Sequence, residues 1–391
     1  MAVFWRALTG GVLLALLGWG AEIQGNSAGK KEVSGSATVN LGQERDIWRP
    51  LIHTTINLSE IRSIKSSFQL RTFDPEGVIF YGDTKKGQDW FVLSLKDGFP
   101  LMQISKEDMV VSVTGGPKLD DGKWHTLEVS NEGKFVILDV DDSGGLVVGM
   151  LSKTEEALSG ELRLALGGVL IDTEKLIVQF QPQLDGCVRD GSWLDLTEPW
   201  ETEVEELWPC YQDVKPGSYF PGTGLALFNT SVFPIKADGG VTFEVWADFS
   251  NIDGTIFSIK SPKGEISSAS FNKTAKELRV FHYPMGITEK TTFDRMGVTF
   301  LPDMVSVNCS RVDMSLSTSF NVSWGDSESA FSTFWTEAQI AFGGLLGNDE
   351  DNAHDPQFLT GCLEKIQVQG QDLDLDLAIK RQSISSHSCP T

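Results

Sequence analysis

The sequence contains the same order of motifs twice, once near its middle and once near its C-terminus. In each copy an apolar run ends in two glycines, a Gly-Cys pair follows at nearly the same spacing, and a second cysteine closes the repeat. The glycine pairs are at 167–168 and 343–344, and the cysteines are Cys187 with Cys210 and Cys362 with Cys389. A chain of 391 residues has room for two domains. We therefore predict two domains of the same fold, at 48–210 and 211–391.

Short alternating runs between turn signals follow one another from residue 48 onward, with almost no helical periodicity. Between residues 66 and 72 large apolar side chains occupy every second position, which is the period of a strand with one buried face. A turn rich in Pro and Gly at 74–77 leads to further strand runs, and the run at 89–95 has the same alternation. The pattern predicts an all-β protein in which each domain is a β-sandwich.

Two polar residues share the faces that should be apolar. The two-residue period puts Ser66 on the same face as Phe68, and Asp89 on the same face as Phe91. A buried hydroxyl or carboxylate without a partner is unfavourable. We therefore expect each to contact either a group of this protein or a bound ligand.

The first 25 residues have the features of a secretory signal peptide, with Arg6 followed by an apolar run and then by small residues. Residues 26–47 are polar and rich in Gly and Ser, and we expect them to be loose. No later stretch is apolar for long enough to span a membrane, so the mature protein is expected to be soluble and secreted. Its formal charge of −22 argues against nucleic acid, heparin or anionic membranes as partners.

Five cysteines in an oxidising compartment allow two disulfides. The repeat pairs Cys187 with Cys210 and Cys362 with Cys389, which leaves Cys309 free. Secreted chains also often carry glycosylation sequons. The candidate glycosylation sites are Asn57, Asn229, Asn272 and Asn321, while the sequon at Asn308 is a poor candidate because Cys309 is its middle residue.

No catalytic constellation is evident. The sequence has no nucleophile elbow, zinc-protease motif or P-loop, and its five histidines are scattered, so we predict no enzyme and no redox or nucleotide cofactor. The acidic alternation at 372–376 is strand-like and lacks the glycine and glutamate spacing of an EF-hand.

Four motifs, in this order, resemble a laminin G-like domain: RTFDPEGVIFYGD, LDDGKWHTLEV, LALGGVL and LDGCVRD, at 71–83, 119–129, 164–170 and 184–190. Two such domains behind a signal peptide are similar to the steroid-binding members of that family. The resemblance covers the first domain nearly end to end, and the second only through its glycine and cysteine motifs. It implies two flattened jelly-roll sandwiches, with a sex steroid between the sheets of the first.

The resemblance also implies roles for individual residues. Ser66 would hydrogen-bond the oxygen of the steroid A-ring, Asp89 would bind the 17-hydroxyl, and Phe91 would pack on the rings. Where mammalian members have an asparagine beside the aspartate, this chain has Lys106, which can donate to a 17-oxygen but cannot accept. Two methionines of the mammalian pocket align with Asn131 and Leu162, so the order of steroid preference is open.

The family binds calcium through the acidic turn, here Asp74 and Glu76, and carboxylates are suitable ligands for it. Its zinc-binding histidines align with Glu107 and Ser159, so we do not predict zinc for this chain. It also implies a homodimer formed through the first domain.

Each steroid-site residue also has an ordinary structural interpretation. Ser66 could bond to backbone, Asp89 could cap the turn at 85–88, Phe91 could be core, and Lys106 could face solvent. Our main hypothesis is a secreted plasma carrier of androgens and oestrogens. The alternative is an adhesion or signalling protein that binds a receptor or glycan. It predicts a basic or exposed aromatic face with calcium, and it does not require Ser66 and Asp89 to point inward.

Overall fold

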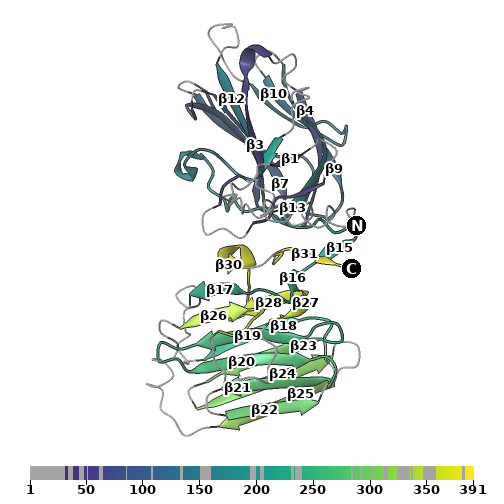
Figure 1. Ribbon diagram of the computed structural model, residues 1–391, viewed down its shortest axis with the longest axis vertical. Helices are drawn as coiled ribbons and strands as arrows, with labels where there is room; N and C mark the ends of the chain where they lie inside the picture. The colour runs from purple at the N-terminus through teal and green to yellow at the C-terminus, as the bar shows by residue number, and fades with distance from the viewer. Residues whose placement is uncertain are drawn as a thin grey trace, which may run out of the picture.

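The computed structural model shows two β-domains stacked along the long axis of the molecule, the first coloured purple to teal and the second green to yellow (Figure 1). It describes residues 31–391 except 34–37, 44–47, 51, 61–64, 85, 107–108, 133–134, 150–159, 194–199, 203–206, 230–232, 234–239, 283–284, 291–292, 302, 312–315, 324–334, 336–337, 347–357 and 381–383. The predicted signal peptide lies outside the described residues, as do Glu107 and Ser159. The all-β prediction is confirmed.

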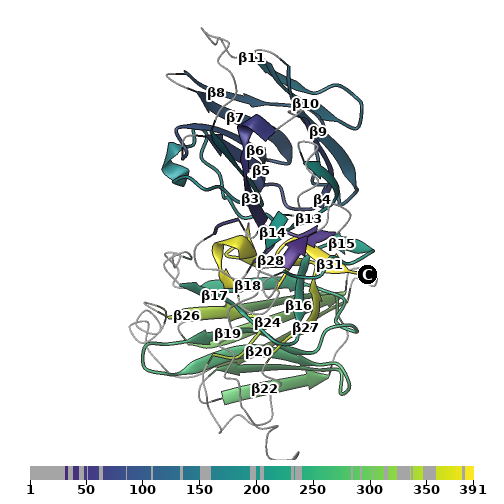
Figure 2. The same cartoon turned by 45° about the horizontal axis from the view of Figure 1, so that its top comes forward.

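The first domain consists of an eight-stranded sheet in the order β1-β14-β3-β12-β5-β6-β7-β8 and a six-stranded sheet in the order β11-β10-β9-β4-β13-β2. Figure 2 shows β5 to β8 on one side of this sandwich and β4, β9 and β10 on the other. The strands are β1 (Lys31–Val33), β2 (Val39–Asn40), β3 (Ile52–Asn57), β4 (Lys65–Thr72), β5 (Gly77–Thr84), β6 (Asp89–Lys96), β7 (Phe99–Lys106), β8 (Met109–Thr114), β9 (His125–Glu132), β10 (Phe135–Val140), β11 (Leu146–Gly149), β12 (Glu161–Leu166), β13 (Gly186–Trp193) and β14 (Trp200–Thr202), with 3-10 turns η1 (Leu58–Glu60) and η2 (Thr173–Lys175).

Alternation along these strands divides the apolar side chains between two clusters. The larger cluster fills the space between the sheets and includes Phe68, Leu93 and Met102. The smaller one, around Tyr81 and Trp90, lies on the other face of the eight-stranded sheet. Both faces of β5 and β6 are therefore covered, which explains why residues 78–81 form a continuous apolar run.

The second domain repeats the design with a seven-stranded sheet, β22-β21-β20-β19-β26-β17-β30, and a six-stranded sheet, β25-β24-β23-β18-β28-β29. Its core is rich in phenylalanine, and the rings of Phe243 and Phe257 stack with centroids 4.7 Å apart. The strands are β15 (Val214–Pro216), β16 (Ser218–Pro221), β17 (Ala226–Asn229), β18 (Val241–Trp246), β19 (Gly254–Lys260), β20 (Ile266–Asn272), β21 (Glu277–His282), β22 (Met285–Lys290), β23 (Arg295–Phe300), β24 (Met304–Arg311), β25 (Leu316–Ser323), β26 (Gln339–Phe342), β27 (Thr360–Leu363), β28 (Lys365–Val368), β29 (Gln371–Asp372), β30 (Ile379–Lys380) and β31 (Ser388–Pro390), with the 3-10 turn η7 (Leu375–Leu377).

The two disulfides join the cysteines that the repeat pairs, and Cys309 is free and buried. The strands of the first domain end at β14 and those of the second begin at β15, on either side of the predicted boundary at residue 210. None of the helices among the described residues is long and apolar enough to cross a bilayer.

Two local predictions are wrong. Residues 26–47 are not uniformly loose, because the described part contains β1 and β2, and Val39 and Leu41 are buried in the core. The stretch 372–376 is not one strand, because β29 ends at Asp372 and the 3-10 turn η7 follows. In both places a few buried apolar side chains decide the conformation, and local composition does not reveal which residues the tertiary fold will bury.

Candidate functional site

Asp89 and Lys106 lie in one row across the eight-stranded sheet of the first domain. The register pairs Thr84 with both Leu162 and Asp89. Trp90 pairs with Ser105, so the same register, continued by one residue, places Asp89 opposite Lys106. Because paired residues point to the same face, this row brings the residues of the predicted 17-hydroxyl end together. Asp89 and Lys106 are both half-buried.

The next row inward contains a glycine beside the predicted ring-packing residue. Gly82 is paired with Leu164 on one side and with Phe91 on the other. The Phe91 ring meets Phe80 edge-on with centroids 6.1 Å apart, and Phe80 meets Phe68 of the opposite sheet at 6.0 Å. Phe91 thus belongs to the edge of the aromatic core, next to a position without a side chain.

Ser66 lies in the opposite sheet, on β4. Its side chain faces the inter-sheet space, as predicted, and is only 1% exposed. Among the described residues its Oγ has no hydrogen-bond partner. The structure therefore does not support the interpretation of Ser66 as a hydroxyl bonded to backbone. An unpaired buried hydroxyl costs on the order of 1–3 kcal/mol, so it is unusual in a well-packed core.

The other residues that define the predicted pocket have mixed environments. Asn131 is half-buried on β9, on the same face as Val129, and Leu162 packs against the inter-sheet core. The roles of Ser66, Asp89 and Lys106 in steroid binding stay predictions. The four predicted glycosylation sites have exposed asparagines, and their glycosylation also stays a prediction.

The carboxylates of the acidic turn accept hydrogen bonds from other groups of the first domain. Glu76 accepts hydrogen bonds from Lys96 Nζ at 3.1 Å and from the backbone N–H of Gln181 at 3.0 Å. The carboxylate of Asp74 is 2% exposed and accepts from the backbone N–H of Glu76 at 3.0 Å and of Asp185 at 2.8 Å. Calcium binding by this turn stays a prediction.

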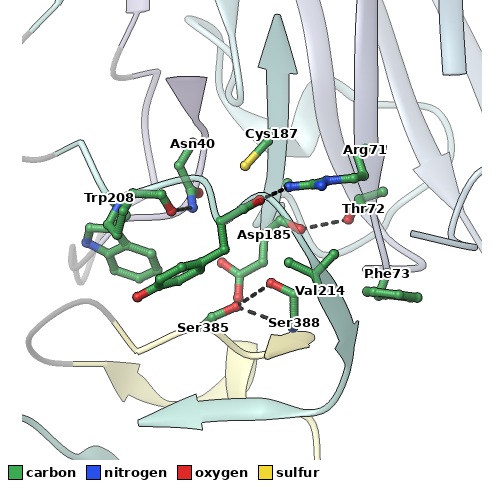
Figure 3. A pocket seen from close by; sticks show the side chains of 13 residues that line it. Asn40, Arg71, Thr72, Phe73, Asp185, Cys187, Trp208, Val214, Ser385 and Ser388 are labelled. Atoms are coloured by element: carbon green, nitrogen blue, oxygen red, sulfur yellow. Dashed lines mark hydrogen bonds between the residues drawn. The ribbon is translucent and has the colours of Figure 1, made fainter. Parts of the chain in front are cut away.

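Asp74 belongs to a buried polar cluster that joins the two domains. The first domain contributes Asp74 and Asp185, and the second contributes Asp376 of η7, Lys380 of β30 and His387 directly before β31. Lys380 Nζ lies 2.7 Å from Asp376 Oδ1 and 3.4 Å from Asp185 Oδ1. Figure 3 shows Asp185 facing Ser385 and Ser388 of the second domain. The pocket drawn there is about 30 Å³, which is room for a single water molecule and not for a steroid.

The ionisation of this cluster follows from its burial and from its neighbours. Burial raises the pKa of Asp74 well above the usual range, and His387 only partly opposes the shift. Burial would raise the pKa of Asp376, but Lys380 and His387 hold it far below the usual range. Burial would lower the pKa of His387, but Asp74 and Asp376 hold it well above the usual value. In this cluster the charged carboxylate of Asp376 is therefore paired with the cations of Lys380 and His387, while burial favours the neutral form of Asp74.

The sequence does not single out these second-domain residues. The alternation at 372–376 predicts a strand for Asp376, and Lys380 and His387 carry no local signal that would set them apart from surface residues. Gly82 did carry a signal, since a glycine inside an apolar strand often marks a close approach or a missing side chain.

Comparison with known proteins places the chain in a family. Residues 70–196 match the family described as laminin G domain. Sex hormone-binding globulin of Phodopus sungorus is 31% identical over 348 residues, an alignment that covers 87% of this chain and 84% of the relative. The chain belongs to the sex hormone-binding globulin family. The sex hormone-binding globulin of Rattus norvegicus is 30% identical over 358 residues, with the same coverage of 87% and 84%. Members of this family are binding proteins, and this chain is a binding protein rather than an enzyme.

The tandem arrangement also occurs outside the sex hormone-binding globulin family. Growth arrest-specific protein 6 of Mus musculus is 26% identical over 369 residues, which cover 87% of this chain and 54% of that protein. Among solved structures, domains LG4-5 of the mouse laminin alpha1 chain superpose with a TM-score of 0.65 at 17% identity and cover 92% of this chain and 96% of that one. At that identity the superposition shows that the fold is shared.

Proposed function

We propose that this protein is a secreted carrier that binds androgens and oestrogens between the sheets of its first domain and transports them in plasma. The observation that carries the proposal is Ser66, whose buried hydroxyl has no partner among the described residues and faces the space between the sheets. A ligand oxygen at that place would satisfy it. Membership of the sex hormone-binding globulin family supports a steroid as the ligand.

The energetics of such a site are divided between apolar and polar contacts. Enclosing about 400 Å² of steroid surface at roughly 25 cal/mol/Å² contributes on the order of 10 kcal/mol before the costs of association. Polar contacts at the two ends then select orientation, because a steroid without the matching oxygen leaves a buried polar group unpaired. In this proposal Ser66 and Asp89 determine which steroids bind, and Lys106 lies beside Asp89.

Secretion is supported by the two disulfides, which form in oxidising compartments, and by the predicted signal peptide. A homodimer through the first domain is part of the proposal and rests on the family resemblance alone. A calcium ion at the turn of Asp74 and Glu76 is likewise a proposal.

Equilibrium binding of tritiated testosterone and oestradiol to the recombinant protein tests the carrier function. We expect saturable binding that is displaced by excess unlabelled steroid. Ser66→Ala should weaken it about tenfold, the equivalent of one lost buried hydrogen bond. Ser67→Ala is the matched control, because Ser67 is the next residue of β4 and faces the other side of the sheet.

The outcomes distinguish the carrier function from the role of Ser66 in the site. Saturable binding that is equal in Ser66→Ala and in wild type would keep the carrier function and remove Ser66 from the site. An absence of saturable binding to folded protein, with calcium present, would contradict the carrier function and favour adhesion or signalling.

A further inference from the structure

The outer face of β24 and β25, in the six-stranded sheet of the second domain, consists of small uncharged polar side chains. On β24 the inward positions Val305, Val307 and Cys309 are buried in the core. The two-residue period therefore turns the positions between them outward, and the strand register extends this face to the paired positions of β25. The residues of this face are Ser306, Asn308, Ser310, Ser317, Ser319 and Asn321.

The edge of this sheet lacks the charges that protect most exposed edges. β25 is the last strand of the sheet among the described strands, and its sequence LSTSFNVS contains no charged residue and no proline. An edge strand has unpaired backbone groups that can pair with another chain, and charged residues or proline commonly prevent this. β22, an edge strand of the other sheet of this domain, contains Glu289 and Lys290. The edge at β25 therefore needs another kind of protection.

Asn308 begins the sequon Asn308-Cys309-Ser310, and its side chain is exposed. The middle cysteine counts against this site in the sequence, although the sequon excludes only proline at that position. In the structure Cys309 is free and 2% exposed. Burial raises the pKa of its thiol to about 12, so the thiol stays protonated and unreactive. The structure thus removes the reason against Asn308.

The residues beside Asn308 leave room for a sugar. Its cross-strand neighbours are Gly297 on β23, which has no side chain, and Ser319 on β25, which is exposed. Among the described residues the side-chain amide of Asn308 has no hydrogen-bond partner, so a glycan on this nitrogen displaces no such contact. Asn321, the acceptor of a second sequon, is also exposed and lies diagonally across from Asn308, because it pairs with Ser306.

We propose that Asn308 carries an N-linked glycan and that this glycan, together with one on Asn321, covers the outer face of β24 and the edge at β25. N-linked glycans are bulky and solubilising, and their hydroxyl groups suit a face of small hydroxyl and amide side chains. Figure 1 shows β25 among the strands farthest from the first domain, so glycans there leave the junction between the domains open. The proposal rests on the secretion proposed above, because sequons are modified in secreted proteins.

Peptide mapping of the protein secreted by eukaryotic cells tests the modification of Asn308. Enzymatic removal of N-glycans in water labelled with heavy oxygen converts each glycosylated asparagine into a labelled aspartate. We expect this label at Asn308 in wild type and its loss in Ser310→Ala, together with the loss of one glycan from the intact mass. Ser310→Thr is the matched control, because it keeps the sequon at the same position. Cys309→Val removes the thiol, keeps the sequon and should keep the label.

The outcomes distinguish this site from secretion itself. An unlabelled Asn308 in a protein that is labelled at other sequons would overturn the inference and leave secretion in place. An absence of label at every sequon would overturn both.

The covering role has a separate test. We expect the double variant Asn308→Gln with Asn321→Gln to aggregate when it is concentrated, because the edge at β25 is then uncovered. Wild type and Asn57→Gln, which loses a sequon of the first domain, should stay dispersed, as light scattering can show. Equal scattering from the three proteins would overturn the covering role.

Discussion

Gly82 has no side chain at a point where the second domain has a large one. If the two domains are matched by their glycine pairs, the strand registers make Gly82 equivalent to Ile259 and Phe91 equivalent to Ser267. The same registers make Ile104 equivalent to His282. The equivalent place in the second domain is therefore occupied by the side chain of Ile259, which supports placing the proposed steroid site in the first domain.

Replacing Gly82 with isoleucine should fill the proposed site from within. A Cβ at Gly82 would lie 3.2 Å from Leu164 Cδ2, so Leu164 must move by a few tenths of an ångström, and the rest of the isoleucine side chain extends next to Phe91. We expect steroid binding to fall at least about a hundredfold, and the free energy of unfolding to fall by about 1–3 kcal/mol. Radioligand binding and urea unfolding measure the two. Ser112→Ile, on the exposed face of β8 in the same sheet, should leave binding unchanged.

His282 makes the second domain sensitive to acid. Burial lowers its pKa to about 4, and its Nδ1 lies 2.5 Å from Ser267 Oγ. An unfolded histidine binds its proton near pH 6.5, so between pH 6.5 and 4 the unfolded state binds more protons and stability falls as the pH falls. At pH 5 the loss should be about 2 kcal/mol relative to pH 7.

Urea unfolding of wild type and His282→Gln at both pH values checks this prediction. The variant should show a smaller loss between pH 7 and pH 5. His125→Gln is the comparison, because His125 should change stability with pH in the opposite direction. Burial would lower the pKa of His125, but Asp141 and Asp121 raise it. His125 therefore adds stability at acidic pH. An equal pH dependence in wild type and His282→Gln would contradict the assignment.

At the scale of the elements, β5 and β12 are joined by a buried ion pair on the face opposite the proposed steroid site. Arg163 donates through Nε to Asp83 Oδ1 at 2.8 Å and through a terminal nitrogen to Oδ2, and Tyr81 also donates to that carboxylate. The Asp83 side chain is fully buried and Arg163 is partly exposed. This geometry satisfies a carboxylate that the two-residue period of β5 places inside the smaller apolar cluster.

Arg163→Met should therefore destabilise the protein strongly. Removing one partner of a buried pair leaves an uncompensated charge, and we expect a loss of about 3 kcal/mol in the free energy of unfolding. The double variant Asp83→Asn with Arg163→Met should lose less than Arg163→Met alone, which denaturant unfolding can show. Lys65→Met, which breaks the exposed pair of Lys65 with Glu128, should change stability by less than about 1 kcal/mol.

At the scale of the whole molecule, the two disulfides each close a loop within the repeat and none joins the domains among the described residues. The junction depends on the buried cluster around Lys380 and on the segment that ends in β31, which lies between the domains in Figure 1. Ser386 extends this junction, because its backbone N–H donates to Asp185 of the first domain.

Lys380→Met should loosen the junction while both sandwiches remain folded. The change leaves Asp185 and Asp376 without their shared cation, and we expect a loss of about 3–5 kcal/mol in the contact between the domains. Small-angle scattering should show a larger radius of gyration, and calorimetry should show two separate transitions. Lys365→Met, which removes an exposed lysine paired with Asp372 in the same domain, should change neither. An unchanged scattering profile in Lys380→Met would contradict this role.

The sequence by itself determined the strand faces, the repeated sandwich and the disulfide pairs. These depend on a two-residue period and on motif spacing, which act locally, and so the inward direction of Ser66 could be predicted from its neighbour Phe68. Only the tertiary structure decided that Gly82 lies beside Phe91 and that Asp74 faces His387 instead of solvent. Lys380 and Asp185 are 195 residues apart, and the packing of one domain on the other sets their contact. No local pattern encodes such a contact, because the burial that makes these charges interact strongly exists only after both domains have folded and docked.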